Sequence, residues 1–261
     1  MKGEPMKREE ISQIDLKLLQ EKYKDNFEFV EQKLKENYPV QYLIGNVDFL
    51  NTNILVDERV LIPRFETELL VAKTIDRIND NHIQNPNILD LGCGSGCISI
   101  ALKKNLLCEV IGVDISEKSL ELARENAKRN EVELQFIKND MTTMSYEGAD
   151  VIISNPPYVK KEEEVGESIK YEPQEAIYAS EEGLYYYQRI IQNISKLEKK
   201  PKLIAFEIGM TQGSAIKEIA QKYLTDYKIE IEKDLTERER YVFLTLNTLS
   251  FFLHSMQNMI R

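Results

Sequence analysis

The chain has 261 residues, of which 42% are hydrophobic and 30% are charged, and its formal net charge is −10. This length suits one large domain or one ordinary domain with a small appendage, and the composition excludes a disordered, collagen-like or coiled-coil chain. The acidic balance disfavours binding of nucleic acid through its phosphates, because such binding needs clustered Lys and Arg. No run of about 18 apolar residues occurs, so no membrane-spanning helix is expected.

The cysteine content predicts neither a disulfide framework nor a metal site. Cys93, Cys97 and Cys108 are an odd number and the two histidines, His82 and His254, are isolated, so no zinc or iron–sulfur spacing is present. Three unpaired thiols are typical of a reducing compartment, and the start, MKGEPMKREE, lacks the apolar core of a signal peptide. We therefore expect a cytoplasmic protein without a bound metal.

The N-terminal region is expected to form a small helical module over residues 1–45. Apolar residues recur at helical spacing in two stretches, at Ile11, Ile14 and Leu18 and at Phe27, Val30 and Leu34. Asn26 lies between the two stretches and can cap the second helix. Positive and negative charges nearly balance here, so the module is not a basic arm.

A β-hairpin is predicted over residues 46–62, within a linker that spans residues 46–65. Its two apolar stretches flank Asn51-Thr52-Asn53, which has the composition of a turn, and Pro63 is expected to end the second strand. A helix is expected to follow over residues 66–78.

Strands and helices alternate from Asn87 onward, which is typical of βαβ units and a parallel sheet. Strands are expected over residues 88–91, 109–113, 134–137, 151–154, 203–208, 229–231 and 241–246. One helix is expected to follow the glycine loop and to extend to Leu102, and further helices are expected over residues 117–129, 183–197 and 211–223. The pattern predicts an α/β domain over residues 66–247. In the apolar tail, residues 248–261, a helix docked on this domain is favoured over a partner-binding helix.

A glycine-rich loop, Gly92-Cys93-Gly94-Ser95-Gly96, follows the strand that contains Asp90. Glycines let the backbone approach a ligand, and the next helix presents free N–H groups, so the loop can hold a pyrophosphate or the amino-acid part of S-adenosylmethionine (SAM). The dinucleotide fingerprint places its third glycine where this chain has Cys97. The pattern resembles motif I of class I methyltransferases more than the dinucleotide fingerprint, which favours SAM.

Acidic residues lie at or just after the ends of two further strands of the expected sheet. Asp114 is placed to accept hydrogen bonds from both ribose hydroxyls of a nucleoside, although it can instead cap a helix together with Ser116. Asp140 can accept from the adenine amino group, with Met141 packed near the ring. The alternative for Asp140 is a simple turn aspartate.

The turn Asn155-Pro156-Pro157-Tyr158 follows the strand over residues 151–154 and therefore lies at the edge where open α/β sheets bind ligands. Two prolines stiffen this turn, which places the Asn155 amide and the Pro156 carbonyl as acceptors for one planar –NH₂ group. Tyr158 can pack on the flat face of the group that carries this nitrogen. Orientation of the weak nucleophile accounts for catalysis without a strong base. A proline turn without chemistry is the alternative.

Several stretches together resemble the HemK/PrmC family of release factor glutamine N5-methyltransferases. Besides Asn155 to Tyr158, they are Pro39 to Gly45, Leu61 to Glu68, Tyr171-Glu172-Pro173 with Gly183-Leu184, and Glu207-Ile208-Gly209 with Gln212-Gly213. The resemblance implies a class I Rossmann-like fold with a helical N-terminal domain, SAM as cofactor and S-adenosylhomocysteine as product. It implies a class 1 release factor as the protein substrate, methylated on the glutamine of its Gly-Gly-Gln motif.

The resemblance also implies roles for individual residues. The residues Gly92, Cys93, Gly94, Ser95, Gly96, Asp114, Asp140, Met141 and Asn155 would bind SAM. The substrate amide would be held by Asn155, Pro156, Pro157 and Tyr158, of which Asn155, Pro156 and Tyr158 are the catalytic candidates. The chain departs from the family pattern in its short N-terminal region, in Phe65 where a proline is usual, and in Glu237 where a glycine is usual.

Other functions are less favoured. A ribosomal-protein glutamine methyltransferase would share the catalytic turn. A nucleic-acid adenine N6-methyltransferase would need a basic recognition region, but Lys160 and Lys161 are followed at once by Glu162, Glu163 and Glu164. A SAM-binding scaffold without turnover would not need the intact turn, and a dehydrogenase would leave the two prolines without a role.

Overall fold

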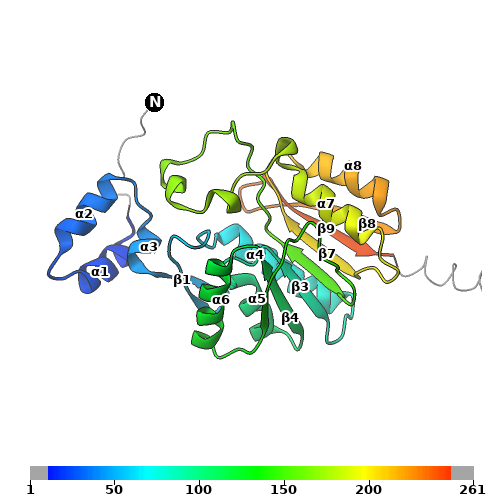
Figure 1. The fold of residues 1–261 in the computed structure, drawn as a ribbon, viewed down its shortest axis with the longest axis horizontal. Helices are drawn as coiled ribbons and strands as arrows, with labels where there is room; N and C mark the ends of the chain where they lie inside the picture. The colour runs from blue at the N-terminus through cyan, green and yellow to red at the C-terminus, as the bar shows by residue number, and fades with distance from the viewer. Residues whose placement is uncertain (1–10, 248–261) are drawn as a thin grey trace, which may run out of the picture.

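The structure, a computed structural model, describes residues 11–247. Its centre is a seven-stranded sheet in the order β5-β4-β3-β6-β7-β9-β8, with helices on both faces and a small helical unit at the N-terminal end (Figure 1). The strands are β3 (Asn87–Leu91), β4 (Glu109–Asp114), β5 (Gln135–Lys138), β6 (Val151–Ser154), β7 (Leu203–Glu207), β8 (Tyr227–Lys233) and β9 (Glu239–Leu246). This Rossmann-like α/β arrangement confirms the predicted fold class.

Strands β3 to β7 are parallel, whereas β9 pairs antiparallel with both β7 and β8. Strands β6 and β7 are buried along their whole length, as expected where helices cover both faces of a parallel sheet. Side chains alternate between the faces, so Val151 and Ile153 pack in one core and Ile152 packs in the other. All seven predicted strands are present.

Helices on the two faces bury apolar stripes against these cores. One face is covered by α4 (Phe65–Asp80), α5 (Cys97–Asn105) and α6 (Glu117–Arg129), and the other by α7 (Tyr185–Ile194) and α8 (Gly213–Tyr223). In α6 the predicted stripe of Leu120, Ala123 and Ala127 is buried. None of the helices within residues 11–247 combines the length and apolar character needed to span a bilayer.

The N-terminal unit consists of α1 (Gln13–Lys22), α2 (Phe27–Lys35) and α3 (Val40–Ile44) around its own small apolar cluster. Asn26 lies at the N-cap of α2, as predicted, although its side chain makes no capping bond. The predicted apolar face of α1 is wrong. Ile14 is 74% exposed and Leu18 43%, whereas Leu19 is buried. The reason is that Ser12 caps the helix through the Asp15 N–H, so the preceding Ile11 does not belong to its helical period.

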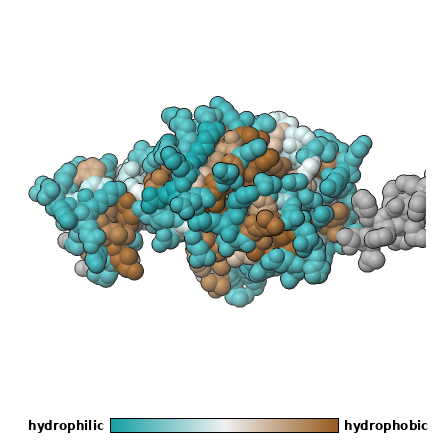
Figure 2. All heavy atoms as spheres, turned by 90° about the horizontal axis from the view of Figure 1, so that it is seen from below, coloured by the Kyte–Doolittle hydropathy of each residue, from teal (hydrophilic) through white to brown (hydrophobic). Residues whose placement is uncertain are grey.

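The N-terminal unit contacts the main body through three tyrosines. The Tyr42 hydroxyl donates to the Val60 carbonyl oxygen at 2.6 Å, and the Tyr171 hydroxyl donates to that of Glu36 at 3.0 Å. The rings of Tyr38 and Tyr171 meet edge to face, 4.9 Å apart. Figure 2 shows a mostly hydrophilic surface with an apolar area on this unit, whose exposed apolar residues are Ile14, Leu18 and Phe29.

The hairpin consists of β1 (Asn46–Phe49) and β2 (Thr52–Leu55), and it is shorter than predicted. Its turn is Leu50-Asn51, both with positive φ, so the predicted turn at residues 51–53 is shifted by one residue. The expected continuation of the second strand to Pro63 is wrong, because Asp57 accepts from the Arg59 N–H and side chain and bends the chain. Residues 56–62 run toward the carboxyl edge of the sheet. The predicted C-terminal helix falls in residues 248–261, outside the described residues.

The turn between β8 and β9 generates a prediction about Glu237, the residue that replaces a glycine. Its φ is 63°, in the left-handed region where an L side chain is strained by about 1–2 kcal/mol. We expect Glu237→Gly to raise the free energy of unfolding by up to about 1 kcal/mol, since the extra backbone entropy of glycine offsets part of the relieved strain. Chemical denaturation would measure this change.

Arg238→Gly is the matched control, because Arg238 lies in the same turn without a positive φ. It should leave stability unchanged or lower it. A Glu237→Gly variant that is no more stable than wild type would show that the left-handed backbone of Glu237 does not cost the protein stability.

Candidate active site

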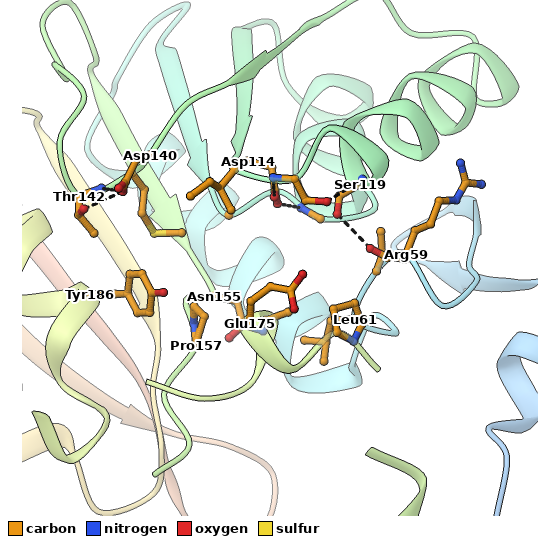
Figure 3. A pocket seen from close by; sticks show the side chains of 18 of the residues that line it. Arg59, Leu61, Asp114, Ser119, Asp140, Thr142, Asn155, Pro157, Glu175 and Tyr186 are labelled. Carbon is orange, nitrogen blue, oxygen red and sulfur yellow. Dashed lines mark hydrogen bonds between the residues drawn. The ribbon is translucent and has the colours of Figure 1, made fainter. Parts of the chain in front are cut away.

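A cavity of about 320 Å³ opens at the carboxyl edge of the sheet, where β3, β4, β5 and β6 end side by side (Figure 3). Parallel strands bring all their carboxyl ends to one edge, so residues far apart in the chain meet there. Of the sequence-predicted site residues, Gly92, Gly94, Asp114, Asp140, Met141, Asn155 and Pro157 line this cavity.

The glycine loop joins β3 to α5, with Gly92, Gly94 and Gly96 all at positive φ. Gly92 and Gly94 line the cavity, whereas Cys93, Ser95 and Gly96 are buried and lie outside its lining. A Cβ on Gly96 would come within 3.1 Å of the Ala123 side chain, so this glycine allows α5 and α6 to pack closely. Burial raises the pKa of the Cys97 thiol to about 12, which keeps it protonated.

Asp114 connects the glycine loop to the start of α6. Its Oδ2 accepts from the Gly94 N–H and its Oδ1 accepts from the Ser116 N–H, both at 2.9 Å. The N-cap of α6 is Ser116 itself, whose hydroxyl accepts from the Ser119 N–H. Burial raises the pKa of Asp114 above its usual value. Its carboxylate therefore both orders the loop and faces the cavity (Figure 3).

Asp140 follows β5 and forms a compact turn with Thr142. The N–H and the hydroxyl of Thr142 both donate to Oδ1 of Asp140, at 2.7 and 2.6 Å. The second oxygen of the carboxylate is left for other donors at the cavity wall. Met141 lies against the glycine loop, since a Cβ on Gly92 would come within 2.9 Å of its methyl carbon.

The lining of the cavity is acidic. Asp114, Asp140 and Glu175 all contribute carboxylates. Arg59 pairs with Asp57 at 2.7 Å and with Glu125 at 3.4 Å, and its guanidinium points away from the cavity (Figure 3). Such a wall favours a cationic ligand such as SAM, which carries a sulfonium and an ammonium group, and disfavours the pyrophosphate of a dinucleotide.

A further carboxylate, Asp90, lies just before the glycine loop but outside the lining of the cavity. It is fully buried beneath the glycine loop, and its Oδ2 accepts from the N–H and hydroxyl of Ser99 at 3.0 and 2.5 Å. Its Oδ1 has no hydrogen-bond partner among the residues that the structure describes. Burial raises its pKa to about 7. Protonation near neutral pH lowers the cost of burying this oxygen without a partner.

Asn155 lies between this cavity and a smaller one of about 100 Å³. Pro156, Tyr158 and the buried Glu207 line the smaller cavity, whereas Pro157 faces the larger one. The side-chain amide of Asn155 donates from Nδ2 to the Thr67 hydroxyl at 3.0 Å. A ligand in the larger cavity and a side chain in the smaller one would therefore meet at Asn155.

The backbone of the proline turn is held from the side of α8. Gln212 donates from Nε2 to the Tyr158 carbonyl oxygen at 2.9 Å and accepts from the Gly209 N–H at 2.9 Å. Gly183, with a φ of 79°, packs directly on the same carbonyl. These contacts fix the position of Tyr158 relative to the sheet.

Several residues of the site carry no sequence signal of their own chemistry. Thr67, Gly183, Glu207 and Gln212 belong to stretches that resemble the family. Glu175, Tyr185 and Tyr186 line the larger cavity without belonging to any predicted site motif. The run of three tyrosines that begins at Tyr185 is the only sequence signal for this wall. Within residues 11–247, no group of three or more His, Cys, Asp or Glu is arranged to hold a metal ion.

The contact of Gly183 with the proline turn generates a prediction. A Cβ at position 183 would overlap the Tyr158 carbonyl oxygen, so Gly183→Ala must displace the turn as well as strain its own backbone. We expect a loss of stability well above the roughly 1–2 kcal/mol of backbone strain alone. Thermal and chemical denaturation would measure it.

Gly148→Ala is the matched control, because Gly148 has a similar φ of 83° and a Cβ at this position would meet no other atom within 4 Å. The loss of stability should be larger in Gly183→Ala than in Gly148→Ala, and the difference is the cost of the overlap with the Tyr158 carbonyl oxygen. Equal losses would show that the contact with Tyr158 has no energetic weight.

Comparison with known proteins agrees with this geometry. A family model described as methyltransferase small domain matches residues 66–177. The release factor glutamine methyltransferase of Streptococcus pneumoniae is 40% identical over 226 residues, which are 85% of this chain and 80% of the relative. That of Lactococcus lactis is 40% identical over 242 residues, 90% of this chain and 84% of the relative.

Solved methyltransferase structures share the fold. The ribosomal protein L11 methylase of Lactobacillus delbrueckii matches with a TM-score of 0.53 at 20% identity, over 74% of this chain and 84% of that chain. The tRNA (uracil-54, C5)-methyltransferase of Pyrococcus abyssi, in complex with S-adenosyl-L-homocysteine, matches with a TM-score of 0.52 at 21% identity. The match covers 77% of this chain and 42% of that chain. Together with the sequence relatives, the fold and the acidic cavity lead to one conclusion: this chain is a SAM-dependent methyltransferase and belongs to the release factor glutamine methyltransferase family.

Proposed function

We propose that this chain methylates the side-chain amide nitrogen, N5, of the glutamine in the Gly-Gly-Gln motif of a class 1 peptide chain release factor. The observation that carries the proposal is the position of Asn155 between two cavities, one large and acidic and one small. The names of the relatives support release factors as the substrate class. A protein substrate also fits the acidic composition better than a polyanion does.

The larger cavity is the proposed SAM site. The backbone of the loop Gly92-Cys93-Gly94-Ser95-Gly96 would hold the amino-acid part, Asp114 the ribose hydroxyls and Asp140 the adenine amino group, with Met141 near the ring. Bound SAM supplies an electrophilic methyl group on a sulfonium. Asn155 borders this site and would also contact the cofactor.

The smaller cavity is the proposed glutamine site. The Asn155 Oδ1 and the Pro156 carbonyl oxygen would accept the two hydrogens of the glutamine –NH₂ group, while Pro157 and Tyr158 hold the amide plane. An amide nitrogen is a poor nucleophile because its lone pair is delocalised. Gripping both hydrogens orients the nitrogen toward the methyl donor, and such alignment can supply up to about 7–11 kcal/mol of the barrier reduction. The new N–C bond would form as the S–CH₃ bond of the sulfonium breaks, leaving a neutral thioether, and the nitrogen would then lose one proton to water.

The N-terminal unit is the proposed recognition module. We propose the division into residues 1–45 for recognition, 46–65 as linker and 66–247 for catalysis, with 248–261 as a tail. The separate apolar cluster of α1 to α3 and the exposed Ile14, Leu18 and Phe29 support a docking role. The unit also contacts Tyr171, which lies near the small cavity's Ile169, so a bound partner would lie close to the entrance.

A direct transfer assay tests the proposed substrate. The protein is incubated with methyl-labelled SAM and a purified class 1 release factor, beside a release factor whose tripeptide glutamine is replaced by alanine. Label on the first protein and not on the second is the expected result. Label on ribosomal protein, DNA or RNA instead would replace this substrate with another.

Removal of the proposed amide acceptor should abolish turnover. We expect Asn155→Ala to lower kcat by at least about 10²-fold, the usual cost of losing one preorganised polar contact to the reacting group. SAM affinity, measured by calorimetry, should fall by a much smaller factor than kcat, because Asn155 only borders the cofactor site. Asn81→Ala, on the exposed end of α4, is the control and should behave like wild type. Near wild-type turnover of Asn155→Ala would refute the proposed mechanism.

Removal of the Asp114 carboxylate should act on the cofactor instead. We expect Asp114→Ala to weaken SAM binding by about 1–3 kcal/mol, the range for hydrogen bonds to a charged group. Asp150→Ala is the matched control, because Asp150 also accepts a backbone N–H, that of Asn87 at 3.2 Å, but at the amino edge of the sheet. Equal SAM affinity of the two variants by calorimetry would refute the role of Asp114.

A further inference from the structure

We propose that Thr67 and Glu207 are positioning residues that fix the side-chain amide of Asn155, so that its oxygen rather than its nitrogen faces the substrate amide. This inference rests on the proposed function and deepens it. Thr67 comes from the first turn of α4 and Glu207 from the last residue of β7, and they are 3% and 1% exposed. Both are buried next to the catalytic turn without belonging to it.

The three side chains form a single hydrogen-bonded chain. The Thr67 hydroxyl donates to Oε2 of Glu207 at 2.6 Å, and Nδ2 of Asn155 donates to the Thr67 oxygen at 3.0 Å. The other carboxylate oxygen, Oε1, accepts from the Tyr158 hydroxyl at 3.4 Å. Glu207 therefore contacts both ends of the catalytic turn, through Thr67 on one side and directly on the other.

The direction of this chain follows from donor and acceptor capacity. An ionised carboxylate only accepts hydrogen bonds, so the single hydroxyl proton of Thr67 must point to Glu207. The Thr67 oxygen then offers only lone pairs to Asn155. The atom of Asn155 next to it must be the –NH₂ group, and the carbonyl oxygen Oδ1 must turn the opposite way.

The orientation matters because the substrate group is also an –NH₂ group. With Oδ1 toward the substrate, Asn155 accepts a hydrogen bond and orients the nitrogen. A half-turn of the amide would place two donors face to face, which loses the bond and adds repulsion. Asparagine has no intrinsic preference between these two orientations, so its neighbours must decide.

The surroundings of Glu207 make this device sensitive to pH. The charge of Arg240 on β9 lowers the pKa of Glu207, and the charge of Glu66 on α4 raises it. Tyr158 contacts the carboxylate directly, and the Tyr187 hydroxyl donates to the Glu207 backbone oxygen at 2.7 Å. Burial, the largest effect, raises the pKa of Glu207 to about 7. A protonated Glu207 can donate to Thr67, which frees the Thr67 hydroxyl to donate to Oδ1 of Asn155. The ionised form is the competent one, so turnover should fall as the pH drops through about 7.

Steady-state kinetics on Thr67 variants test the proposal. Thr67→Val keeps the shape but removes the hydroxyl, and we expect kcat to fall by about 10- to 100-fold, as for other small misplacements of a catalytic group. Thr67→Ser keeps the hydroxyl and should restore most of the rate. Thr74→Val is the matched control, because Thr74 is buried on the same helix with its hydroxyl donating to the Leu70 carbonyl oxygen, away from the site.

The pH profile separates positioning from simple structural support. The acid limb of kcat that we expect in wild type should be absent in Thr67→Val and in Glu207→Gln, because neither variant retains a titrating partner coupled to Asn155. An unchanged acid limb in both variants, or a Thr67→Val kcat equal to that of wild type, would overturn the proposal. Melting temperatures of all variants identify any that fail to fold.

A measurement without turnover keeps this proposal separable from the proposed function. The Nδ2 protons of Asn155 can be followed by nitrogen-15 NMR, assigned with Asn155→Ala. We expect slow hydrogen exchange of one proton in wild type and Thr67→Ser, and fast exchange in Thr67→Val. If wild type methylates no release factor but shows this pattern, the substrate is wrong and the positioning chain stands. Equal exchange in wild type and Thr67→Val would refute the chain.

Discussion

The parallel pairing of β3 to β7 is the constraint on which the site depends. Parallel strands must all end at the same edge, so each strand brings the residues that follow it to one place. The glycine loop, Asp114, Asp140 and Asn155 lie at or just after the ends of four different strands, yet they surround one cavity. Because helices cover the sheet on both faces, its strand ends are held in place, and they fix the positions at which the site loops begin.

The strand ends alone do not determine the chemistry, because the Asn155 amide can turn either its oxygen or its nitrogen toward a substrate. The buried carboxylate of Glu207 decides between these two orientations, since an acceptor can only be satisfied by a donor. One charge at the end of β7 thereby sets the direction of two hydrogen bonds that lead to the proline turn. The arrangement costs the protein a buried charge, and the raised pKa of Glu207 is the physical expression of that cost.

The sequence was sufficient for the parts of the structure that depend on local pattern. Short apolar runs between turn residues predicted every strand of the sheet, and β6 begins and ends where its pattern predicts. The glycine loop and the proline turn were recognisable because glycine and proline act on their own backbone. The face of α1 was predicted wrongly, since one capping serine changes which residues belong to the helical period. Thr67 and Glu207 lie 140 residues apart, and no local pattern connects them.

The acidic wall of the larger cavity has a consequence for the order of events at the end of a catalytic cycle. Methyl transfer converts a sulfonium into a neutral thioether, so the spent cofactor carries one positive charge fewer than the fresh one. In the proposed SAM site, the carboxylates of Asp114, Asp140 and Glu175 would attract the charged form more strongly than the neutral form of nearly the same shape. The cavity would therefore favour exchange of spent for fresh cofactor. Added salt should reduce the difference in affinity between the two forms, because it screens the charges.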